Sequence, residues 1–259
     1  MALFKKRKVA LALGGGSARG FANIGVLKVL EKNKVPINLF IGSSIGSLIA
    51  AAYSLGMTTE ELEKYALAFK IQDITDVTVP RLAVMKGEKL ARTVEKLTDQ
   101  KTFENCRIPI AVTATDIQTG EELLFTSGDL QKIIRASCSW PGFFPPVKID
   151  GRYLSDGGIR NSVPVKWAKK LGGTFTIAVK LGFSPQNIKA DNIFKMMIQS
   201  IQIMGEELDK YQSMQANIII EPDLEKINQT DFDKASDIIA KGEIAAEREI
   251  PKIKKLLRI

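Results

Sequence analysis

The sequence predicts an α/β fold with a mostly parallel central sheet. Its short apolar runs show no alternation of polar and apolar residues, which is typical of strands that are covered on both faces. Stretches with helical spacing of apolar residues separate these runs, as expected when helices connect parallel strands. The predicted strands are residues 9–13, 37–41, 108–113, 175–181 and 218–220.

The predicted helices follow from apolar spacing and end signals. Residues 21–31 place apolar side chains at positions 21, 24, 26, 27 and 30. Thr58 and Glu61 form a capping box at the start of a helix that runs to about Phe69. Two hairpins turn through Thr119-Gly120 and Asp150-Gly151, the second of which is a favoured two-residue turn. The remaining helices are predicted at 45–55, 88–97, 129–137, 192–211 and 232–250, and Pro251 should break or kink the last one.

Length and composition indicate one domain. The chain has 259 residues, and we divide it into a basic lead-in at 1–8 and a single domain at 9–259. No apolar run approaches the roughly 18 residues of a membrane-spanning helix. The apolar run at 9–13 is also too short for a signal peptide. Cys106 and Cys138 are too few for a disulfide scaffold or a zinc cluster. We therefore expect a cytoplasmic protein, with a peripheral position at the inner membrane face as an extension of that expectation.

Charge and histidine content narrow the function classes. The formal net charge of +8 favours an anionic partner, such as nucleic acid, lipid headgroups or a phosphorylated ligand, although a solvated basic surface explains it equally well. The chain contains no histidine. This absence excludes a Ser-His-Asp triad, a Cys-His pair and any histidine-ligated metal site within the chain.

Three glycines in series follow the first predicted strand. Gly14, Gly16 and Gly20 resemble a dinucleotide-binding loop, but the segment after the next strand lacks the acidic residue that would bind a ribose. Packing is a second interpretation. The third is an oxyanion hole, in which backbone N–H groups of the glycines face a developing negative charge. Arg19 opposes the helix dipole in the first helical turn, so we expect it to serve an anion or an internal carboxylate.

A candidate nucleophile follows the second predicted strand. Gly42, Ser44 and Gly46 form G-x-S-x-G between an apolar strand and a helix. This context is that of a nucleophile elbow, in which the flanking glycines relieve crowding and expose the serine hydroxyl. A tight strand-to-helix turn without catalysis would have the same spacing.

The serine needs a base other than histidine. Asp156 follows a short strand, and Gly157 and Gly158 let the backbone pass close to another segment. A surface turn is the alternative explanation of this D-G-G stretch. Asp116 is a competing acid that spacing does not exclude, whereas Lys28 and Lys34 have the pattern of a helix face and a loop.

Together these blocks resemble the patatin-like phospholipase family, and in particular its compact bacterial members. The resemblance covers roughly residues 8–182 and includes the stretch "ATDIQTGEELLFTSGDLQKIIRASCSWPGFFPPVKIDGRYLSDGGIRNSVPV". It implies a three-layer α/β/α fold and a Ser–Asp dyad that acts on ester bonds of lipids. Carried over by position, Ser44 is the nucleophile and Asp156 its base. The oxyanion hole is then formed by Gly14, Gly15 and Gly16, with supporting roles for Arg19, Gly42, Gly46, Gly157 and Gly158. Ser17 and Asn23 depart from the glycine and histidine that many bacterial relatives have there.

The predicted function is a serine lipid acyl hydrolase. Desolvation would raise the pKa of the aspartate towards working pH and make it an adequate base. The reaction would pass through an acyl-enzyme on Ser44 and needs no metal or other cofactor. The expected partner is a lipid or acyl ester, with no nucleic acid. A non-catalytic lipid-binding protein on the same fold is the alternative, and an NADP-dependent enzyme is a distant third.

Softer features bear on the substrate. The aromatic loop with Trp140, Phe143 and Phe144 either packs rigidly or walls an acyl groove. Methionines adapt to flexible chains, but core filling is the more common role, and we expect it for Met196, Met197, Met204 and Met214. The basic cluster Lys5-Lys6-Arg7-Lys8 either contacts anionic headgroups or is a solvated tail.

Overall fold

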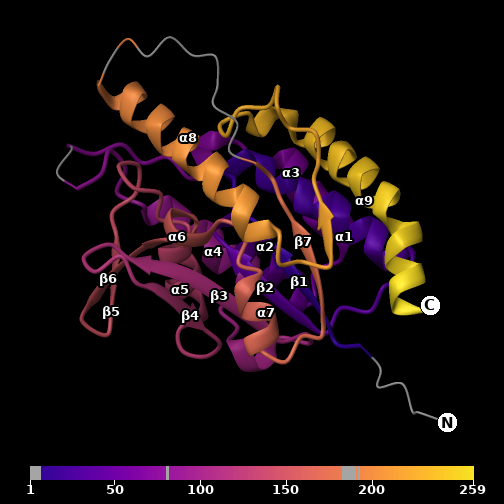
Figure 1. Cartoon of the computed structure of the whole chain (residues 1–259). Coiled ribbons are helices and arrows are strands. Elements are labelled where there is room, and N and C mark those ends of the chain that lie inside the picture. The colour runs from indigo at the N-terminus through magenta and orange to yellow at the C-terminus, as the bar shows by residue number, and fades with distance from the viewer. Residues whose placement is uncertain (1–6, 80–81, 183–190, 192) are drawn as a thin grey trace.

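A sheet of eight strands organises the computed structural model of the chain, which describes residues 7–79, 82–182, 191 and 193–259 (Figure 1). Strands β3, β2, β1, β7 and β8 lie side by side in that order and are parallel, whereas β4 and β6 pair with β3 and β5 with β6 in antiparallel orientation. The sheet is therefore mostly parallel, as predicted. The strands are β1 (Val9–Leu13), β2 (Leu39–Ser43), β3 (Ile110–Asp116), β4 (Glu122–Phe125), β5 (Val147–Ile149), β6 (Arg152–Asp156), β7 (Phe175–Val179) and β8 (Ile218–Ile220).

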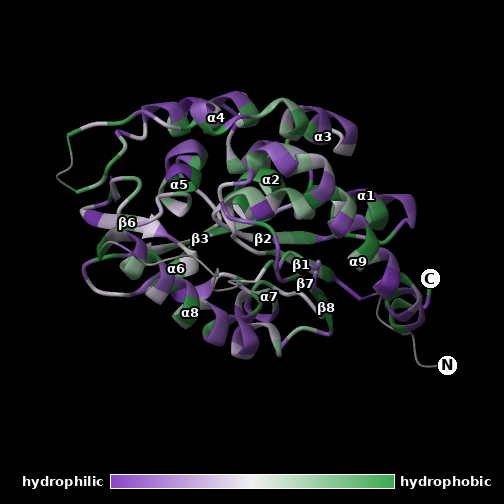
Figure 2. Cartoon of the chain, turned by 90° about the horizontal axis from the view of Figure 1, so that it is seen from above, coloured by the Kyte–Doolittle hydropathy of each residue, from purple (hydrophilic) through white to green (hydrophobic). Residues whose placement is uncertain are grey.

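Helices cover both faces of this sheet. Figure 2 shows α1 to α5 on one side and α6, α7 and α8 on the other, which confirms the three-layer α/β/α arrangement. The α-helices are α1 (Ala22–Lys32), α2 (Ile45–Ser54), α3 (Thr59–Ala68), α4 (Glu88–Thr98), α5 (Leu130–Ser137), α6 (Gly158–Asn161), α7 (Lys166–Lys170), α8 (Ile193–Ser213) and α9 (Ala235–Leu257). Short 3-10 helices are η1 (Ser17–Phe21), η2 (Ile71–Asp73), η3 (Phe103–Asn105) and η4 (Phe232–Lys234). The short helices α6 and α7 were not predicted, since four or five residues carry too little periodicity.

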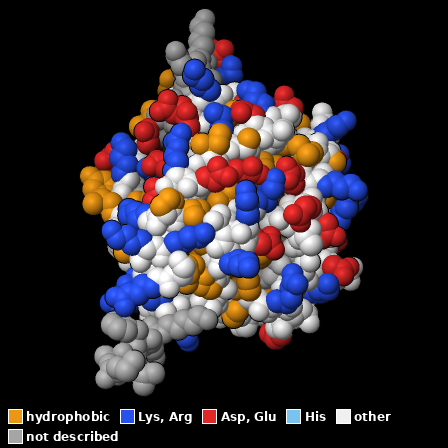
Figure 3. All heavy atoms as spheres, turned by 90° about the vertical axis from the view of Figure 1, so that its right-hand side faces the viewer, with side chains coloured by type: hydrophobic (Ala, Val, Ile, Leu, Met, Phe, Trp, Pro, Cys, Tyr) orange, Lys and Arg blue, Asp and Glu red, His pale blue; other side chains and the backbone are white. Residues whose placement is uncertain are grey.

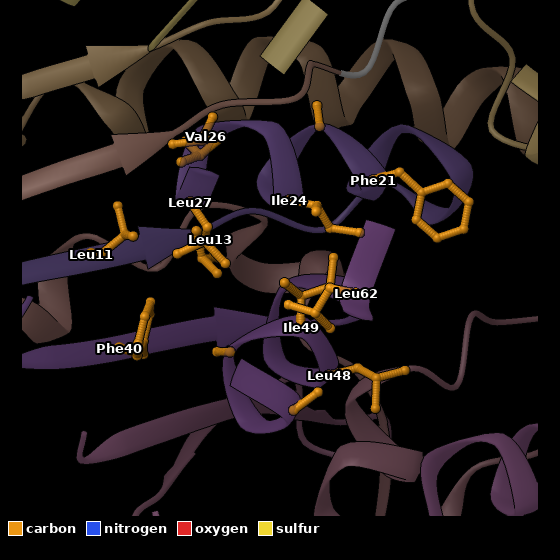
Figure 4. Close-up of a cluster of buried hydrophobic side chains, with 14 of the residues drawn as sticks. Leu11, Leu13, Phe21, Ile24, Val26, Leu27, Phe40, Leu48, Ile49 and Leu62 are labelled. Carbon is orange, nitrogen blue, oxygen red and sulfur yellow. The ribbon is translucent and has the colours of Figure 1, made fainter. Parts of the chain in front are cut away.

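The two faces of β1 show how the sheet is buried. Leu11 and Leu13 point into the large core together with α1 and α2 (Figure 4). Ala10 and Ala12 point to the opposite face, where they pack against Ala168 of α7 and against Val163. Every residue of β1 is fully buried. The continuous apolar run is therefore explained by packing on both faces, as parallel sheets require.

Local signals at helix ends and turns are confirmed. The Thr58 hydroxyl accepts the Glu61 N–H at 3.1 Å, and the Glu61 carboxylate accepts the Thr58 N–H at 2.8 Å. Asp150 and Gly151 have φ angles of 48° and 80°, as the predicted two-residue hairpin turn between β5 and β6 requires.

The predicted end of the last helix is wrong, because α9 continues through Pro251 to Leu257. Ile250 and Ile253, on either side of the proline, are buried. In the part of α9 before the proline, the helix backbone packs directly on α1, since a Cβ at Gly242 would lie 2.1 Å from the Ala22 carbonyl oxygen. This close packing on α1 offsets the hydrogen bond that proline removes.

Only part of the basic lead-in lies within the described residues. Lys5 and Lys6 are outside them. Arg7 stacks its guanidinium over the Phe175 ring at 5.3 Å, and the Lys8 carbonyl accepts the Thr174 N–H at 2.8 Å. Arg7 and Lys8 thus join the start of β1 to β7.

Candidate active site

Ser44 lies at a strained turn between β2 and α2. Its backbone angles are φ 51° and ψ −131°, a region that non-glycine residues rarely occupy. Both flanking glycines are required by close backbone contacts. A Cβ at Gly42 would lie 2.3 Å from the Ser47 Cα, and one at Gly46 would lie 2.3 Å from the Leu13 carbonyl oxygen. This strand–turn–helix geometry is that of a nucleophile elbow.

Asp156 is hydrogen-bonded to Ser44. The Ser44 Oγ donates to Asp156 Oδ2 at 2.7 Å, and the Gly158 N–H donates to Asp156 Oδ1 at 2.7 Å. Asp156 ends β6, opposite Ala114 of β3, and only 2% of it is exposed. Burial raises its pKa to about 6, although the hydrogen bonds from Ser44 and Gly158 act in the opposite direction. The carboxylate is therefore a stronger base than an exposed aspartate.

Gly157 lets β6 approach the elbow. A Cβ at this position would lie 2.7 Å from both the Ser43 Oγ and the Thr113 carbonyl oxygen. The glycines after Asp156 thus have different tasks, because Gly157 permits the contact and Gly158 donates to the carboxylate.

The competing titratable groups have structural partners elsewhere. Asp116 forms an ion pair with Arg152 at 3.6 Å and accepts the Gln118 N–H at 3.0 Å. The backbone hydrogen bond from Gln118 holds the pKa of Asp116 below its ordinary value. Lys28 forms ion pairs with Glu63 and Glu243 on the helical face.

The amides of the glycine loop differ from one another in a way that the predicted oxyanion hole of Gly14, Gly15 and Gly16 did not include. The Gly14 N–H donates to the Val179 carbonyl oxygen at 3.2 Å, and the Gly15 N–H donates to the Ser162 carbonyl oxygen at 3.1 Å. These two amides are already engaged. The amides of Gly16 and Ser17 make no hydrogen bond to the described part of the chain, and both residues line the cavity beside Ser44. Of the three predicted donors, only Gly16 keeps an amide that can meet a ligand.

The engaged amides position the loop. Gly15 packs so closely on the elbow that a Cβ there would lie 3.1 Å from the Ser44 Cβ. Buried Asn23 donates from Nδ2 to the Gly14 carbonyl oxygen at 3.2 Å. Three glycines in a row are therefore needed because the naked backbone packs against three neighbouring segments at once.

Arg19 has a different partner from the one expected. Its buried guanidinium donates from Nε to the Ile227 carbonyl oxygen at 2.8 Å and from Nη1 to the Gly182 carbonyl oxygen at 2.7 Å. Burial lowers its pKa, and the charge of Asp231 acts in the opposite direction. Arg19 thus ties the loop after β7 and the 222–231 segment to the start of η1, behind the glycine loop.

An apolar cavity of about 330 Å³ opens beside Ser44. Ser44, Asp156, Gly16 and Ser17 lie at one part of its wall. The rest is mostly apolar and includes the aromatic loop, so Trp140, Phe143 and Phe144 wall a groove rather than only packing rigidly. Cys138 also lines the cavity, and burial raises the pKa of its thiol to about 12, with the Asp156 charge acting in the same direction.

Other cavity residues escaped the sequence analysis. Phe21, Tyr65, Phe69 and Phe232 come from three segments, since Tyr65 and Phe69 both belong to α3 and its C-cap, and all four residues line the cavity. Phe69 contacts the rings of the other three. Their local sequences resemble ordinary core positions, so no signal in the sequence could have grouped them.

The described ranges contain no group of three or more acidic or cysteine side chains arranged to hold a metal ion. Among the same residues, no helix combines the length and the apolar character that a membrane crossing requires.

Comparison with known proteins identifies the family. The family model described as patatin-like phospholipase matches residues 11–169, which include Ser44 and Asp156. The chain belongs to the patatin-like phospholipase family. The three sequence blocks that resembled this family thus fall in the matched region.

Several relatives share the same region. The chain is 34% identical over 182 residues to patatin-like phospholipase domain-containing protein 6 of Homo sapiens, an alignment that covers 67% of this chain and 13% of that protein. It is 32% identical over 186 residues to lysophospholipase NTE1 of Meyerozyma guilliermondii, covering 70% of this chain and 13% of that protein. The chain therefore spans only a small part of these relatives.

The fold also matches a solved structure. VipD from Legionella pneumophila superposes with a TM-score of 0.67 at 11% sequence identity, over 96% of this chain and 67% of that one. At this identity the likeness concerns the fold alone.

Proposed function

We propose that the chain is a serine lipid acyl hydrolase in which Ser44 and Asp156 form the catalytic dyad. The observation that carries this proposal is the 2.7 Å hydrogen bond between them at the wall of an apolar cavity. The N–H groups of Gly16 and Ser17, which make no hydrogen bond to the described part of the chain, lie at the same part of the wall. Membership of the patatin-like phospholipase family supports it independently. It also argues against the NADP-dependent enzyme considered from the sequence.

The first half-reaction acylates the enzyme. Asp156 takes the proton from the Ser44 Oγ, which attacks the acyl carbon of the ester. The carbonyl oxygen becomes an oxyanion and is held by the N–H groups of Gly16 and Ser17. The tetrahedral intermediate then expels the alcohol, which receives the proton from Asp156, and the acyl group remains on Ser44.

The second half-reaction restores the enzyme. Asp156 takes a proton from water, and the resulting hydroxide adds to the acyl carbon in the same oxyanion site. The new intermediate expels the Ser44 oxygen, which regains its proton from Asp156, and a fatty acid leaves. The raised pKa of Asp156 suits both directions of transfer, since a base works best when its pKa is near the operating pH.

The cavity supports an acyl ester with one aliphatic chain as the substrate. Its volume of about 330 Å³ is near the lower end of ligand pockets, which span roughly 300–1,000 Å³. Its walls are mostly apolar outside the dyad region. One relative is named a lysophospholipase, and a lysophospholipid is an ester with one acyl chain. We therefore place single-chain esters first among the substrates to be tested.

Covalent labelling tests the proposal directly. A fluorophosphonate probe should label Ser44, as read by mass spectrometry of the digested protein, and Asp156→Asn should label far more slowly. Ser162→Ala serves as a matched control, because it removes another buried serine hydroxyl that is bonded to an aspartate. Absence of labelling in the folded protein would favour the alternative of a lipid-binding protein without catalysis.

A further inference from the structure

Helix α8 buries three polar side chains and exposes seven of its large apolar ones. Gln202, Asp209 and Ser213 face inward and are at most 6% exposed. The exposed apolar residues are Ile193, Met196, Met197, Ile203, Met204, Leu208 and Tyr211, with exposed fractions of 45–79%, and the charged residues Lys195, Glu207 and Lys210 are exposed among them. The expectation that these methionines fill the core is therefore wrong, and Met214 is also 72% exposed. Water is an unfavourable neighbour for such a stripe, which marks it as an interaction surface.

The same helix forms part of the cavity rim. Ile198 and Gln202 line the cavity, within two residues along the chain of the exposed Met197 and Met204. In Figure 1, α8 crosses the front of the molecule with its first turns close to the upper edge. The outward stripe is therefore continuous with the wall of the substrate cavity.

A second exposed apolar segment lies on the rim. Val77, Val79 and Leu82 are 75%, 82% and 73% exposed. The segment is held to the aromatic wall of the cavity, because the Val84 N–H donates to the Gly142 carbonyl oxygen at 3.0 Å and Met85 lines the cavity itself. Two segments far apart in the sequence thus present apolar side chains around one opening.

Basic residues lie on the segments around this opening. Met85, Gly158 and Ile198 of the cavity wall stand in stretches of sequence without Asp or Glu, at 77–87, 157–165 and 192–205, although Asp76, Asp191 and Glu206 border these stretches. They do contain Lys86, Arg160 and Lys195, of which Lys195 pairs with Asp191. The side of the molecule that carries α9 differs, since Figure 3 shows acidic and basic side chains interspersed there.

From these observations we propose that the rim formed by α8 and by residues 77–79 and 82–85 docks on a lipid surface that contains anionic headgroups. Exposed methionine, valine and leucine side chains would enter the boundary between headgroups and acyl chains, while the cations meet the headgroups. The cavity would then open towards the lipid. The docking itself stands on the surface alone, and only its role in substrate delivery rests on the proposed function.

Vesicle binding of the full chain carrying Ser44→Ala tests the docking without hydrolysis. The probes are vesicles of phosphatidylcholine with and without phosphatidylglycerol, and bound protein is measured by sedimentation. Met197→Gln with Met204→Gln should weaken binding by about tenfold or more, since each change removes a buried apolar side chain from the lipid. Val79→Gln with Leu82→Gln should act in the same direction. The matched control is Ile244→Gln on α9, which alters a residue of similar exposure on another side of the molecule and should leave binding unchanged.

Two results would overturn the docking proposal. The first concerns the α8 pair, Met197→Gln with Met204→Gln. If this pair has no effect while replacing Lys5, Lys6, Arg7 and Lys8 with Gln abolishes vesicle binding, the contact belongs to the basic lead-in. Self-association in light scattering that the α8 pair abolishes would assign the stripe to a second copy of the chain.

Hydrolysis separates this proposal from the proposed function. In the chain that retains Ser44, the α8 pair should lower turnover of vesicle lipid but not of a short soluble ester. If no ester is turned over at all, the proposed function fails, while vesicle binding by the Ser44→Ala chain still decides the docking.

Discussion

Within the described residues, two serines donate to buried aspartates, and only one of these Ser–Asp pairs has the surroundings of a catalytic site. Ser44 donates to Asp156, and Ser162 donates to Asp209. Both aspartates are 2% exposed. Burial raises the pKa of each to about 6. By the hydrogen bond, the burial of the aspartate and its pKa alone, the two pairs are equivalent, although Ser44 is partly exposed and Ser162 is buried.

Their surroundings differ in three respects. Ser44 has strained backbone angles, whereas Ser162 has ordinary helical angles of φ −70° and ψ −29°. Ser44 and Asp156 line the cavity, and neither member of the other pair does. Finally, the N–H groups of Gly16 and Ser17 line the same cavity as Ser44 and make no hydrogen bond to the described residues. At Ser162, by contrast, the carbonyl oxygen accepts the N–H of Gly15. The second pair therefore anchors α8 beside the glycine loop, and a raised aspartate pKa is by itself a poor marker of catalysis.

The largest expected difference between the pairs is in turnover. Asp156→Asn should reduce kcat/KM for a soluble ester by on the order of a thousandfold or more, because an amide cannot take the proton of the serine. Asp209→Asn should change it by no more than a few-fold. Ester hydrolysis by both purified variants, with thermal melting to confirm folding, measures this. A dead but folded Asp209→Asn protein beside an active Asp156→Asn protein would reverse the assignment.

The pH profile should also distinguish the pairs. Asp156 acts as a base only when ionised, and its pKa is about 6. We expect kcat/KM for a soluble ester to be flat above that pH and to fall about tenfold per pH unit below it. Asp209→Asn should leave the midpoint where it is. A midpoint near 4 in the unaltered chain, or one that moves in Asp209→Asn, would contradict the role given to Asp156.

The sequence was sufficient to predict that Ser44 and Asp156 form a pair and that each follows a strand. Ser44 and Asp156 each follow a recognisable strand and have glycines beside them. Their meeting does not follow from parallel strand ends, because β6 is antiparallel to β3 and places Asp156 opposite Ala114. The continuous apolar runs, which lack alternation, likewise predicted the sheet. These features are local, so a single sequence contains them.

The parts that were missed depend on contacts between distant segments. The engagement of the Gly15 amide needs Ser162, and the ring cluster around Phe69 needs three separated segments. The outward face of α8 was also unpredictable from periodicity, because a helical pattern shows that one face is apolar but not which face is covered. Pro251 was misjudged since the packing of α9 on α1 outweighs a local signal.

The pairs should behave alike in their effect on stability. An aspartate whose pKa is higher in the folded than in the unfolded protein makes the folded state bind the proton more tightly. The free energy of unfolding therefore falls as pH rises from about 4 to about 6, and it stays lower above that range. A rise from 3.8 to about 6 corresponds to about 3 kcal/mol as an upper limit. Asp156→Asn and Asp209→Asn should each remove about 2 kcal/mol of this fall, measured by urea unfolding at pH 4.5 and 7.5. An undiminished fall in either variant would mean that its aspartate titrates normally.

The smallest expected effect is the difference in stability between a Gly and an Ala variant at each serine, and its sign should be opposite at Ser44 and Ser162. Replacement by Ala or by Gly removes the hydroxyl in both cases, so the difference between the two variants reports the backbone alone. At Ser44 the angles of φ 51° and ψ −131° strain any residue with a Cβ, and Ser44→Gly should be more stable than Ser44→Ala by about 1 kcal/mol. At Ser162 the helical angles suit Ala, and Ser162→Gly should be less stable than Ser162→Ala by about 1 kcal/mol. Urea unfolding of the four variants measures both differences at one pH. The same sign at both positions would show that the elbow of Ser44 is not strained, and the contrast between the pairs would then rest on the cavity and the amides alone.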